Sequence, residues 1–251
     1  MEDYQLLIDL HKNAIRQGPG GDAETEKALD LTMLDRAAPI KIADIGCGTG
    51  ASTLKLASLL NARLTAVDFF QDFLDILEVR AKNQGLSDKI TTLACSMANL
   101  PFGEEEYDVI WSEGAIYNIG FEKGVKEWNR YLKVGGLLVV SEITWTTGSR
   151  PSKLQKYWDD EYSEIDVASS KIGILEKSGY SPIGYFVLPE HCWVANYYQP
   201  LQNRFKDFLN QNGNSEEAQA VVEVENREIE LYEKYKAYYN YGVYVARKLD
   251  E

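Results

Sequence analysis

The chain has 251 residues, enough for one α/β domain with additions, and its 45% apolar and 26% charged residues are ordinary for a soluble globular protein. Its 26 basic residues against 39 acidic ones give a net charge of −13, which disfavours nucleic-acid and anionic membrane partners. The Met1-Glu2-Asp3 start lacks the features of a signal peptide, and no apolar run approaches the roughly 20 residues of a membrane span. We therefore expect a cytoplasmic protein with no nucleic-acid and no membrane partner.

The cysteines indicate neither a disulfide framework nor a metal centre. Cys47, Cys95 and Cys192 are widely separated and show no metal-ligand spacing. We predict no bound metal.

Two helices are expected before the first strand. Apolar residues recur at helical spacing over 3–17, and Asp22 can cap a second helix that continues to about residue 36. The glycine-rich stretch 18–21 breaks the chain between them.

Strands and helices then alternate. Strands are predicted at 40–45, 63–68, 89–95, 107–113 and 137–143, with helices at 51–60, 71–84 and 121–132 and a glycine turn at 133–136. Strands separated by helices of ten or more residues require right-handed parallel crossovers. This pattern predicts a doubly wound α/β sheet with helices on both faces.

The pattern loosens after residue 145. We expect a mobile cover segment at 151–168, a helix at 169–178, a strand at 180–188, a helical insertion at about 193–236 and a final strand at 238–248.

The most informative motif joins the first strand to the helix that follows it. Asp44 ends the strand, and Gly46, Cys47, Gly48 and Gly50 form a glycine-rich turn. Glycine lets the backbone turn sharply and lets a ligand approach the main chain, and the helix start offers unpaired N–H groups. With Ala51, the glycines also satisfy the dinucleotide fingerprint, so they leave a methyl donor and a nicotinamide cofactor both open.

The acid-x-Gly-x-Gly-x-Gly pattern of Asp44, Gly46, Gly48 and Gly50 resembles the class I S-adenosylmethionine-dependent methyltransferases. The resemblance implies S-adenosylmethionine as the cofactor and places its methionine amino group against Asp44. A carboxylate at this position favours that interpretation, because dinucleotide folds usually have an apolar strand residue there and a buried carboxylate needs partners. Bonds to nearby loop amides are the alternative for Asp44.

Asp68, at the end of the second strand, can accept two hydrogen bonds from a ribose diol. Both the methyl-donor and the nicotinamide interpretations use it, and a helix cap at residue 71 is the structural alternative. We count Asp68 and its neighbour Phe69 among the cofactor-binding candidates.

The segment Ser96 to Phe102 resembles the family's adenine-binding loop, with Ser96 where an aspartate commonly stands. The resemblance assigns Ser96, Met97 and Ala98 to the adenine, with the Met97 thioether beside the ring. A turn with a core methionine is the alternative.

Three residues are candidates to orient an acceptor or take its proton. Glu113 and Tyr117 follow the fourth strand, where open α/β sheets bind ligands, and the resemblance also brings Glu113 to the cofactor. His191 could face an acceptor pocket and titrate near neutral pH. For each of the three, a packing, capping or surface role is the alternative.

The N-terminal break and the late aromatic residues are candidate covers of the site. Residues 16–21, with Gly20 against the cofactor, are expected to fold over the donor site as a lid, and a plain helix–helix turn is the alternative. Aromatic side chains in the variable segments could line an apolar acceptor site or cradle a cation, or simply pack the insertion against the sheet: Tyr157, Trp158, Tyr162, Trp193, Tyr197 and Tyr198.

The sequence therefore predicts a Rossmann-like seven-stranded sheet with helices on both faces, an antiparallel C-terminal edge and an added helical cap. We assign residues 1–38 to a helical lid, 39–145 to the S-adenosylmethionine-binding core, and 146–251 to the rest of the same domain. The predicted function is S-adenosylmethionine-dependent methylation of a small molecule by direct displacement, in a monomer or a homodimer. The alternatives are an NAD-dependent oxidoreductase and a non-catalytic cofactor-binding module.

Overall fold

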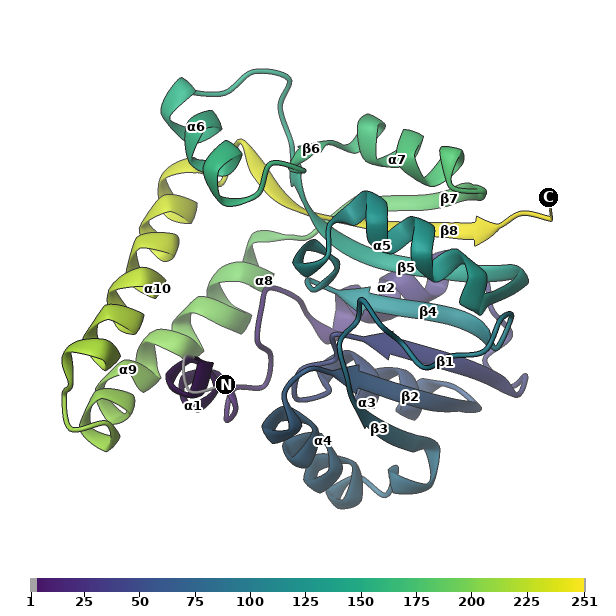
Figure 1. Ribbon diagram of the computed structural model, residues 1–251, viewed down its shortest axis with the longest axis horizontal. Helices are drawn as coiled ribbons and strands as arrows, with labels where there is room; N and C mark the ends of the chain where they lie inside the picture. The colour runs from purple at the N-terminus through teal and green to yellow at the C-terminus, as the bar shows by residue number, and fades with distance from the viewer. Residues whose placement is uncertain (1–3, 251) are drawn as a thin grey trace.

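A computed structural model describes residues 4–250, whose strands form one mixed sheet flanked by helices (Figure 1). In chain order the helices and strands are α1 (Gln5–His11), α2 (Asp22–Thr32), β1 (Ile40–Ile45), α3 (Ala51–Leu59), β2 (Ala62–Asp68), α4 (Gln71–Asn83), β3 (Ile90–Ala94), β4 (Tyr107–Glu113), α5 (Phe121–Trp128), β5 (Leu132–Trp145), α6 (Ser152–Glu161), β6 (Asp166–Val167), α7 (Ala168–Lys177), β7 (Tyr180–Val187), α8 (Glu190–Trp193), α9 (Gln199–Gln211), α10 (Glu216–Tyr235) and β8 (Tyr239–Lys248). Short 3-10 turns occur at η2 (Ser87–Lys89), η3 (Ile116–Asn118) and η4 (Asn129–Tyr131), and a π-helical turn at η5 (Val194–Tyr198). Residues 1–3, where the predicted first helix and the acidic start begin, lie outside the described residues.

The strand order is β3-β2-β1-β4-β5-β8-β7. The first five strands pair in parallel, and β8 runs antiparallel between β5 and β7. The predicted doubly wound sheet with an antiparallel strand near its C-terminal edge is confirmed. An eighth strand, the two-residue β6, pairs with the end of β5 outside this order and was not predicted, because two residues are too few to show an alternating pattern.

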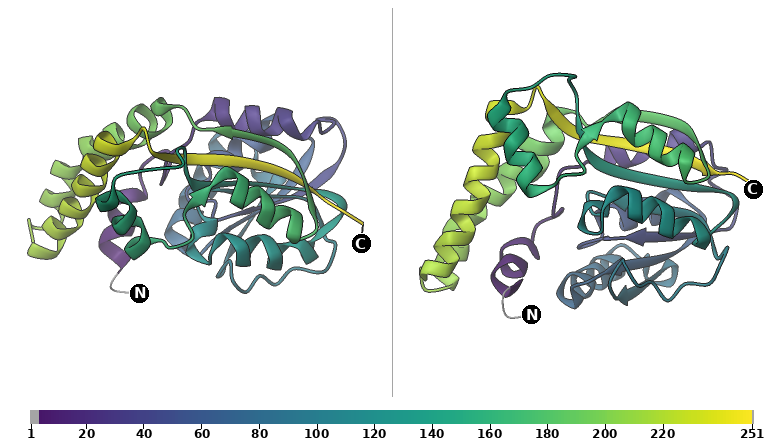
Figure 2. Two further views of the ribbon diagram at one scale, coloured as in Figure 1. Left: turned by 90° about the horizontal axis from the view of Figure 1, so that it is seen from above. Right: turned by 45° about the horizontal axis from the view of Figure 1, so that its top comes forward.

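Alternate residues of the central strands enter two different cores, which is why most residues of those strands are apolar. Ile42 and Val109 face the core under α2 and α3, whereas Ala43 and Ile110 face the core under α5 and α7. Figure 2 shows α2 on one side of the sheet and α5 and α7 on the other. Over residues 4–250, no helix combines the length and the apolar character needed to cross a membrane.

Several predicted boundaries were wrong. The helix predicted at 121–132 ends at Trp128, and the strand predicted at 137–143 extends over Leu132–Trp145. The segment at 151–168, predicted as a mobile cover, contains helix α6 and strand β6. The first helix ends at His11 instead of residue 17, since the Ala14 carbonyl bonds side chains of Gln17 and Arg80. The second helix ends at Thr32, because Met33 adopts a left-handed conformation with φ of 54°. The turn predicted at 133–136 belongs to β5, whose pairing with β4 shifts register there and places Gly135 at φ of 75°.

The insertion helices extend beyond the sheet edge where the parallel strands end (Figure 1). α8, α9 and α10 connect β7 to β8 in the chain, and α1 lies alongside α9. The carboxyl ends of β1, β2 and β4 therefore face a region bounded by the insertion and the N-terminal segment.

A fully buried ion pair joins β5 to α7 beside this region. Lys171 Nζ lies 3.2 Å from Glu142 Oε1, and both side chains are completely buried. Burial lowers the pKa of Lys171 and raises the pKa of Glu142, and each partner opposes the shift of the other. The pair needs both members because either charge alone would be stranded in a low-dielectric interior.

We expect Lys171→Met to lower the free energy of unfolding by about 3–5 kcal/mol, because it leaves a buried carboxylate uncompensated. Urea denaturation measures this loss. The double variant Lys171→Met/Glu142→Leu should recover most of it. A double variant as unstable as the single one would show that packing, and not charge, is responsible.

Candidate functional site

The glycine-rich loop after β1 is tightly surrounded by neighbouring groups. Gly46, Gly48 and Gly50 have φ of 76°, 55° and 85°, values that favour glycine. The amides of Gly46 and Cys47 donate to the Val67 carbonyl at 2.8 and 2.9 Å. A β-carbon on Gly46 would overlap the Ala115 side chain. A larger residue would therefore not fit at this position of the loop.

Asp44 lies directly beneath this loop with no exposed surface. Its Oδ2 accepts hydrogen bonds from Ser52 Oγ at 2.8 Å and from Thr53 Oγ1 at 2.6 Å. Its Oδ1 is buried and has no partner among residues 4–250. Burial raises the pKa of Asp44 to about 7, although the two hydroxyl groups oppose the shift. One oxygen of this carboxylate is thus free to accept a hydrogen bond from a ligand.

Asp68 closes the other side of the loop at the end of β2. Its carboxylate accepts hydrogen bonds from the Gly48 amide at 2.8 Å and from the Phe70 amide at 3.0 Å. Burial raises its pKa. A carboxylate offers about four acceptor positions, so two remain for a diol. Phe69, the next residue, is 60% exposed.

The segment predicted to hold an adenine lies against the same loop. The Met97 methyl group is 3.3 Å from the position of a β-carbon on Gly46. Ser96 Oγ accepts a hydrogen bond from the Ala98 amide at 3.3 Å, and Ala98 is exposed. Ser96, Met97 and the glycine loop therefore adjoin, as the sequence predicts for one binding site.

Glu113, at the end of β4, is hydrogen-bonded through both carboxylate oxygens. Arg16 Nη1 donates to Oε2 at 2.9 Å, and Trp111 Nε1 and Thr25 Oγ1 donate to Oε1 at 2.9 and 2.7 Å. A β-carbon on Gly20 would lie only 2.8 Å from Arg16 Nη1. Glu113 thus fixes the N-terminal segment to the sheet, and its proposed role as an acceptor base stays a prediction.

A second set of contacts, whose partners were not predicted, holds this segment of the expected lid over the glycine loop. Gln17 Oε1 accepts from the Thr49 amide at 2.8 Å, and Gln17 Nε2 donates to Thr49 Oγ1 at 3.0 Å. Arg80 Nη2 donates to the Ala14 carbonyl at 2.8 Å. A β-carbon on Gly48 would collide with the Gln17 amide oxygen. We call these contacts of Gln17 and Arg80 with Thr49 and Ala14 the clasp. Its only signal in the sequence was the position of Gln17 beside the glycine-rich break.

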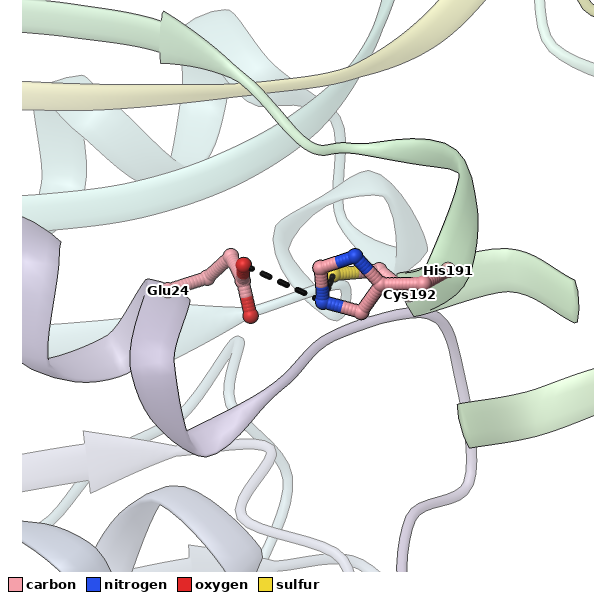
Figure 3. Close-up of side chains that lie close together, drawn as sticks. All are labelled: Glu24, His191 and Cys192. Carbon is pink, nitrogen blue, oxygen red and sulfur yellow. Dashed lines mark hydrogen bonds and ion pairs between the residues drawn. The ribbon is translucent and has the colours of Figure 1, made fainter. Parts of the chain in front are cut away.

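The two remaining catalytic candidates lie apart from each other. Tyr117, in η3, is 42% exposed and packs against Tyr162 at a ring-centre distance of 6.1 Å. His191 Nε2 lies 3.3 Å from Glu24 Oε1 and 3.8 Å from Cys192 Sγ (Figure 3). A catalytic role for either residue stays a prediction.

Glu24, His191 and Cys192 also form a candidate set of metal ligands, which the sequence spacing did not predict. Their ligand atoms lie within 4.8 Å of one another. Burial raises the pKa of the Cys192 thiol, and the neighbouring Glu24 charge acts in the same direction. In the present arrangement the Glu24–His191 ion pair links α2 to α8 (Figure 3).

Comparison with known proteins places this geometry among methyltransferases. Residues 42–136 match the family described as "Methyltransferase domain". Methyltransferase GfsG of Streptomyces halstedii is 27% identical over 124 residues, 49% of this chain and 44% of the relative, and the demethylmenaquinone methyltransferase of Bacteroides fragilis is 32% identical over 108 residues, 42% of this chain and 44% of the relative. The matches thus span less than half of these curated relatives. A Geobacter sulfurreducens S-adenosylmethionine-dependent methyltransferase, solved with S-adenosyl-L-homocysteine, shares the fold with a TM-score of 0.84 at 16% identity, over 97% of this chain and 98% of that one.

We expect Gln17→Ala to release the N-terminal segment from the glycine loop, because it removes the bonds to Thr49. Limited trypsin digestion should cut after Lys12 or Arg16 several-fold faster than in the unmodified protein. Gln202→Ala, a change at an exposed position of α9, is the matched control. Equal cleavage rates in both variants would show that Gln17 does not hold the segment.

Proposed function

Because this chain belongs to the class I S-adenosylmethionine-dependent methyltransferases, we propose that it transfers the methyl group of S-adenosylmethionine to a small-molecule acceptor by direct displacement. The observation that carries this proposal is the buried Asp44 Oδ1, which has no partner within the described chain. A ligand amino group is the donor that would satisfy it.

The residues around the loop fit the methyl donor group by group. Asp44 Oδ1 would accept from the amino group of the methionine part, and the two unused acceptor positions of Asp68 would bind the ribose hydroxyls. Ser96 and Met97 would contact the adenine. The bound sulfonium supplies an already activated methyl group, so the enzyme needs no covalent intermediate.

The chain's own contribution is to align the reactants and keep water out. Arg16 and Gln17 hold the N-terminal segment across the carboxyl ends of β1 and β4. A cover of this kind fixes the acceptor close to the methyl carbon, and proximity accounts for much of the rate enhancement in such displacements. Glu113 holds the cover in place through Arg16.

Ligand-induced stabilisation distinguishes this function from the nicotinamide alternative. S-adenosylhomocysteine should raise the melting temperature with the logarithm of its concentration above the dissociation constant, with about 2.7 kcal/mol of stabilisation at 100 times that constant. NADH at the same concentrations should give no shift. Stabilisation by NADH alone would overturn the proposal. Binding of S-adenosylhomocysteine with no turnover of any acceptor would favour the non-catalytic module.

The second prediction concerns the pH dependence of donor binding. Asp44 must be ionised to pair with a cationic amino group, so affinity for S-adenosylhomocysteine should fall as the pH drops below about 7, by up to tenfold per unit. Asp44→Asn should bind weakly at every pH. Calorimetric titrations between pH 5.5 and 8.5 measure both, with exposed Asp75→Asn as the control.

Asp44 also makes the free energy of unfolding depend on pH, in the direction opposite to that of donor affinity. The folded-state pKa of Asp44 lies above its usual value of 3.8, so the folded protein holds this proton more tightly than the unfolded chain. Its contribution is therefore favourable below pH 4 and lost as the pH rises through about 7. The difference in unfolding free energy between Asp44→Asn and the unmodified protein should grow over this range. A constant difference would contradict the assignment.

A further inference from the structure

Tyrosine side chains from four separate elements gather beside the glycine loop. We call Tyr117 of η3, Tyr162 after α6, Tyr197 of η5 and Tyr241 of β8, together with Glu228 of α10, the tyrosine chamber. Tyr197 and Tyr241 are more than nine-tenths buried. The ring centres of Tyr117 and Tyr162 lie 6.1 Å apart, and the ring of Tyr197 lies 5.1 Å from that of Tyr198, whose hydroxyl donates to Glu228. Burial raises the pKa of Tyr197 and of Tyr241, and the charges of Glu228 and of Tyr117, respectively, act in the same direction.

The chamber adjoins the proposed donor site. The Tyr241 hydroxyl lies 3.8 Å from the position of a β-carbon on Gly114. The next residue, Ala115, packs directly against Gly46 of the glycine loop. The chamber and the loop that we assign to the methyl donor are therefore linked by two consecutive residues, Gly114 and Ala115.

The chamber contains more negative charge than its own residues neutralise. Glu228 accepts a hydrogen bond from Tyr198 Oη at 3.0 Å, and no basic side chain within residues 4–250 forms an ion pair with it. Burial, and then the charge of Glu225, raises the pKa of Glu228 to about 7. Glu228 is half-buried, and a carboxylate that is largely removed from water without a positive partner is costly unless a ligand supplies one.

Glu225, one turn earlier on α10, also has a carboxylate oxygen that accepts no hydrogen bond in the described chain. Its Oε1 pairs with His11 Nε2 at 3.1 Å, but its Oε2 is buried and has no partner in the described chain. The His11 and Glu225 side chains are only 7% and 9% exposed. The His11 ring stacks on Tyr197 with the ring centres 6.3 Å apart, so the Glu225 carboxylate that pairs with His11 lies beside the chamber.

Neutral phenol rings around an unpaired carboxylate are the surroundings that bind an organic cation. Ring faces attract a positive charge, and the carboxylate pairs with it. A phosphate, carboxylate or phenolate acceptor would be repelled by Glu225 and Glu228. Resting on the methyltransferase function proposed above, we infer that the acceptor is a small organic amine that binds in the tyrosine chamber as a cation and is methylated on nitrogen.

Glu228 and the methyl donor account for the proton and the methyl group that move in this reaction. Glu228 accepts a proton from the ammonium form of the acceptor and leaves a neutral amine. The nitrogen lone pair forms a bond to the methyl carbon while the carbon–sulfur bond breaks and its electron pair stays on sulfur. The product is a methylated ammonium ion and S-adenosylhomocysteine, and the Glu228 proton passes to water. The raised pKa of Glu228 suits this transfer near neutral pH.

The test compares cations with neutral molecules of the same shape. Calorimetry with saturating S-adenosylhomocysteine would measure binding of choline against 3,3-dimethylbutan-1-ol and of butylamine against 1-butanol. We expect at least one cation to bind ten times more tightly than its neutral counterpart. Glu228→Gln should reduce that preference to less than threefold, and Glu230→Gln, at an exposed position of the same helix, should leave it unchanged.

Each outcome bears on one proposal. A preference below tenfold for both cations in the unmodified protein would overturn the amine assignment, whether or not the variants fold. A preference that survives Glu228→Gln would place the cation elsewhere and overturn the chamber. The titration with S-adenosylhomocysteine alone, performed first, tests the methyltransferase function separately.

Discussion

The half-satisfied carboxylate of Asp44 is the constraint on which the rest of the site depends. Ser52 and Thr53 bond one of its oxygens, and both hydroxyls come from the helix that follows the glycine loop. This arrangement fixes the start of α3 against the end of β1 and leaves the second oxygen without a donor in the described chain. A protein that needed only stability would place an apolar residue here, as dinucleotide folds do. The carboxylate therefore indicates a binding function.

The N-terminal segment and the insertion both follow from where this carboxylate lies. Glycines in the loop leave room for the protein itself as well as for a ligand, since Gln17 occupies the space over Gly48. Arg16 then reaches Glu113 at the end of the neighbouring strand. Packing of α1 against α9 and the pairing of His11 with Glu225 extend the same surface to the insertion. The donor site and the tyrosine chamber thus share one cover.

The sequence predicted the core elements well because their patterns are local. β1 and β4 begin and end where their apolar segments predicted, and the acid-led glycine motif alone was enough to locate the loop between β1 and α3. Helix ends were less predictable, since side chains from distant residues determine them: Arg80 bonds the Ala14 carbonyl from 66 positions away. For the same reason the clasp and the role of Glu228 could not be predicted. The residues of each form no recognisable sequence motif, and their roles appear only when the fold brings α1, α4 and α10 together.

The position of β8 has a consequence for how the chain is assembled during synthesis. β7 pairs with the sheet only through β8, and the mostly helical segment from Leu188 to Tyr238 is made between the two strands. Until the ribosome has completed β8, the nascent β7 has no strand to pair with and β5 presents an unpaired apolar edge, the kind of surface that promotes aggregation. A premature stop codon within α10 would therefore remove two strands of the sheet, although only one of them is missing from the product.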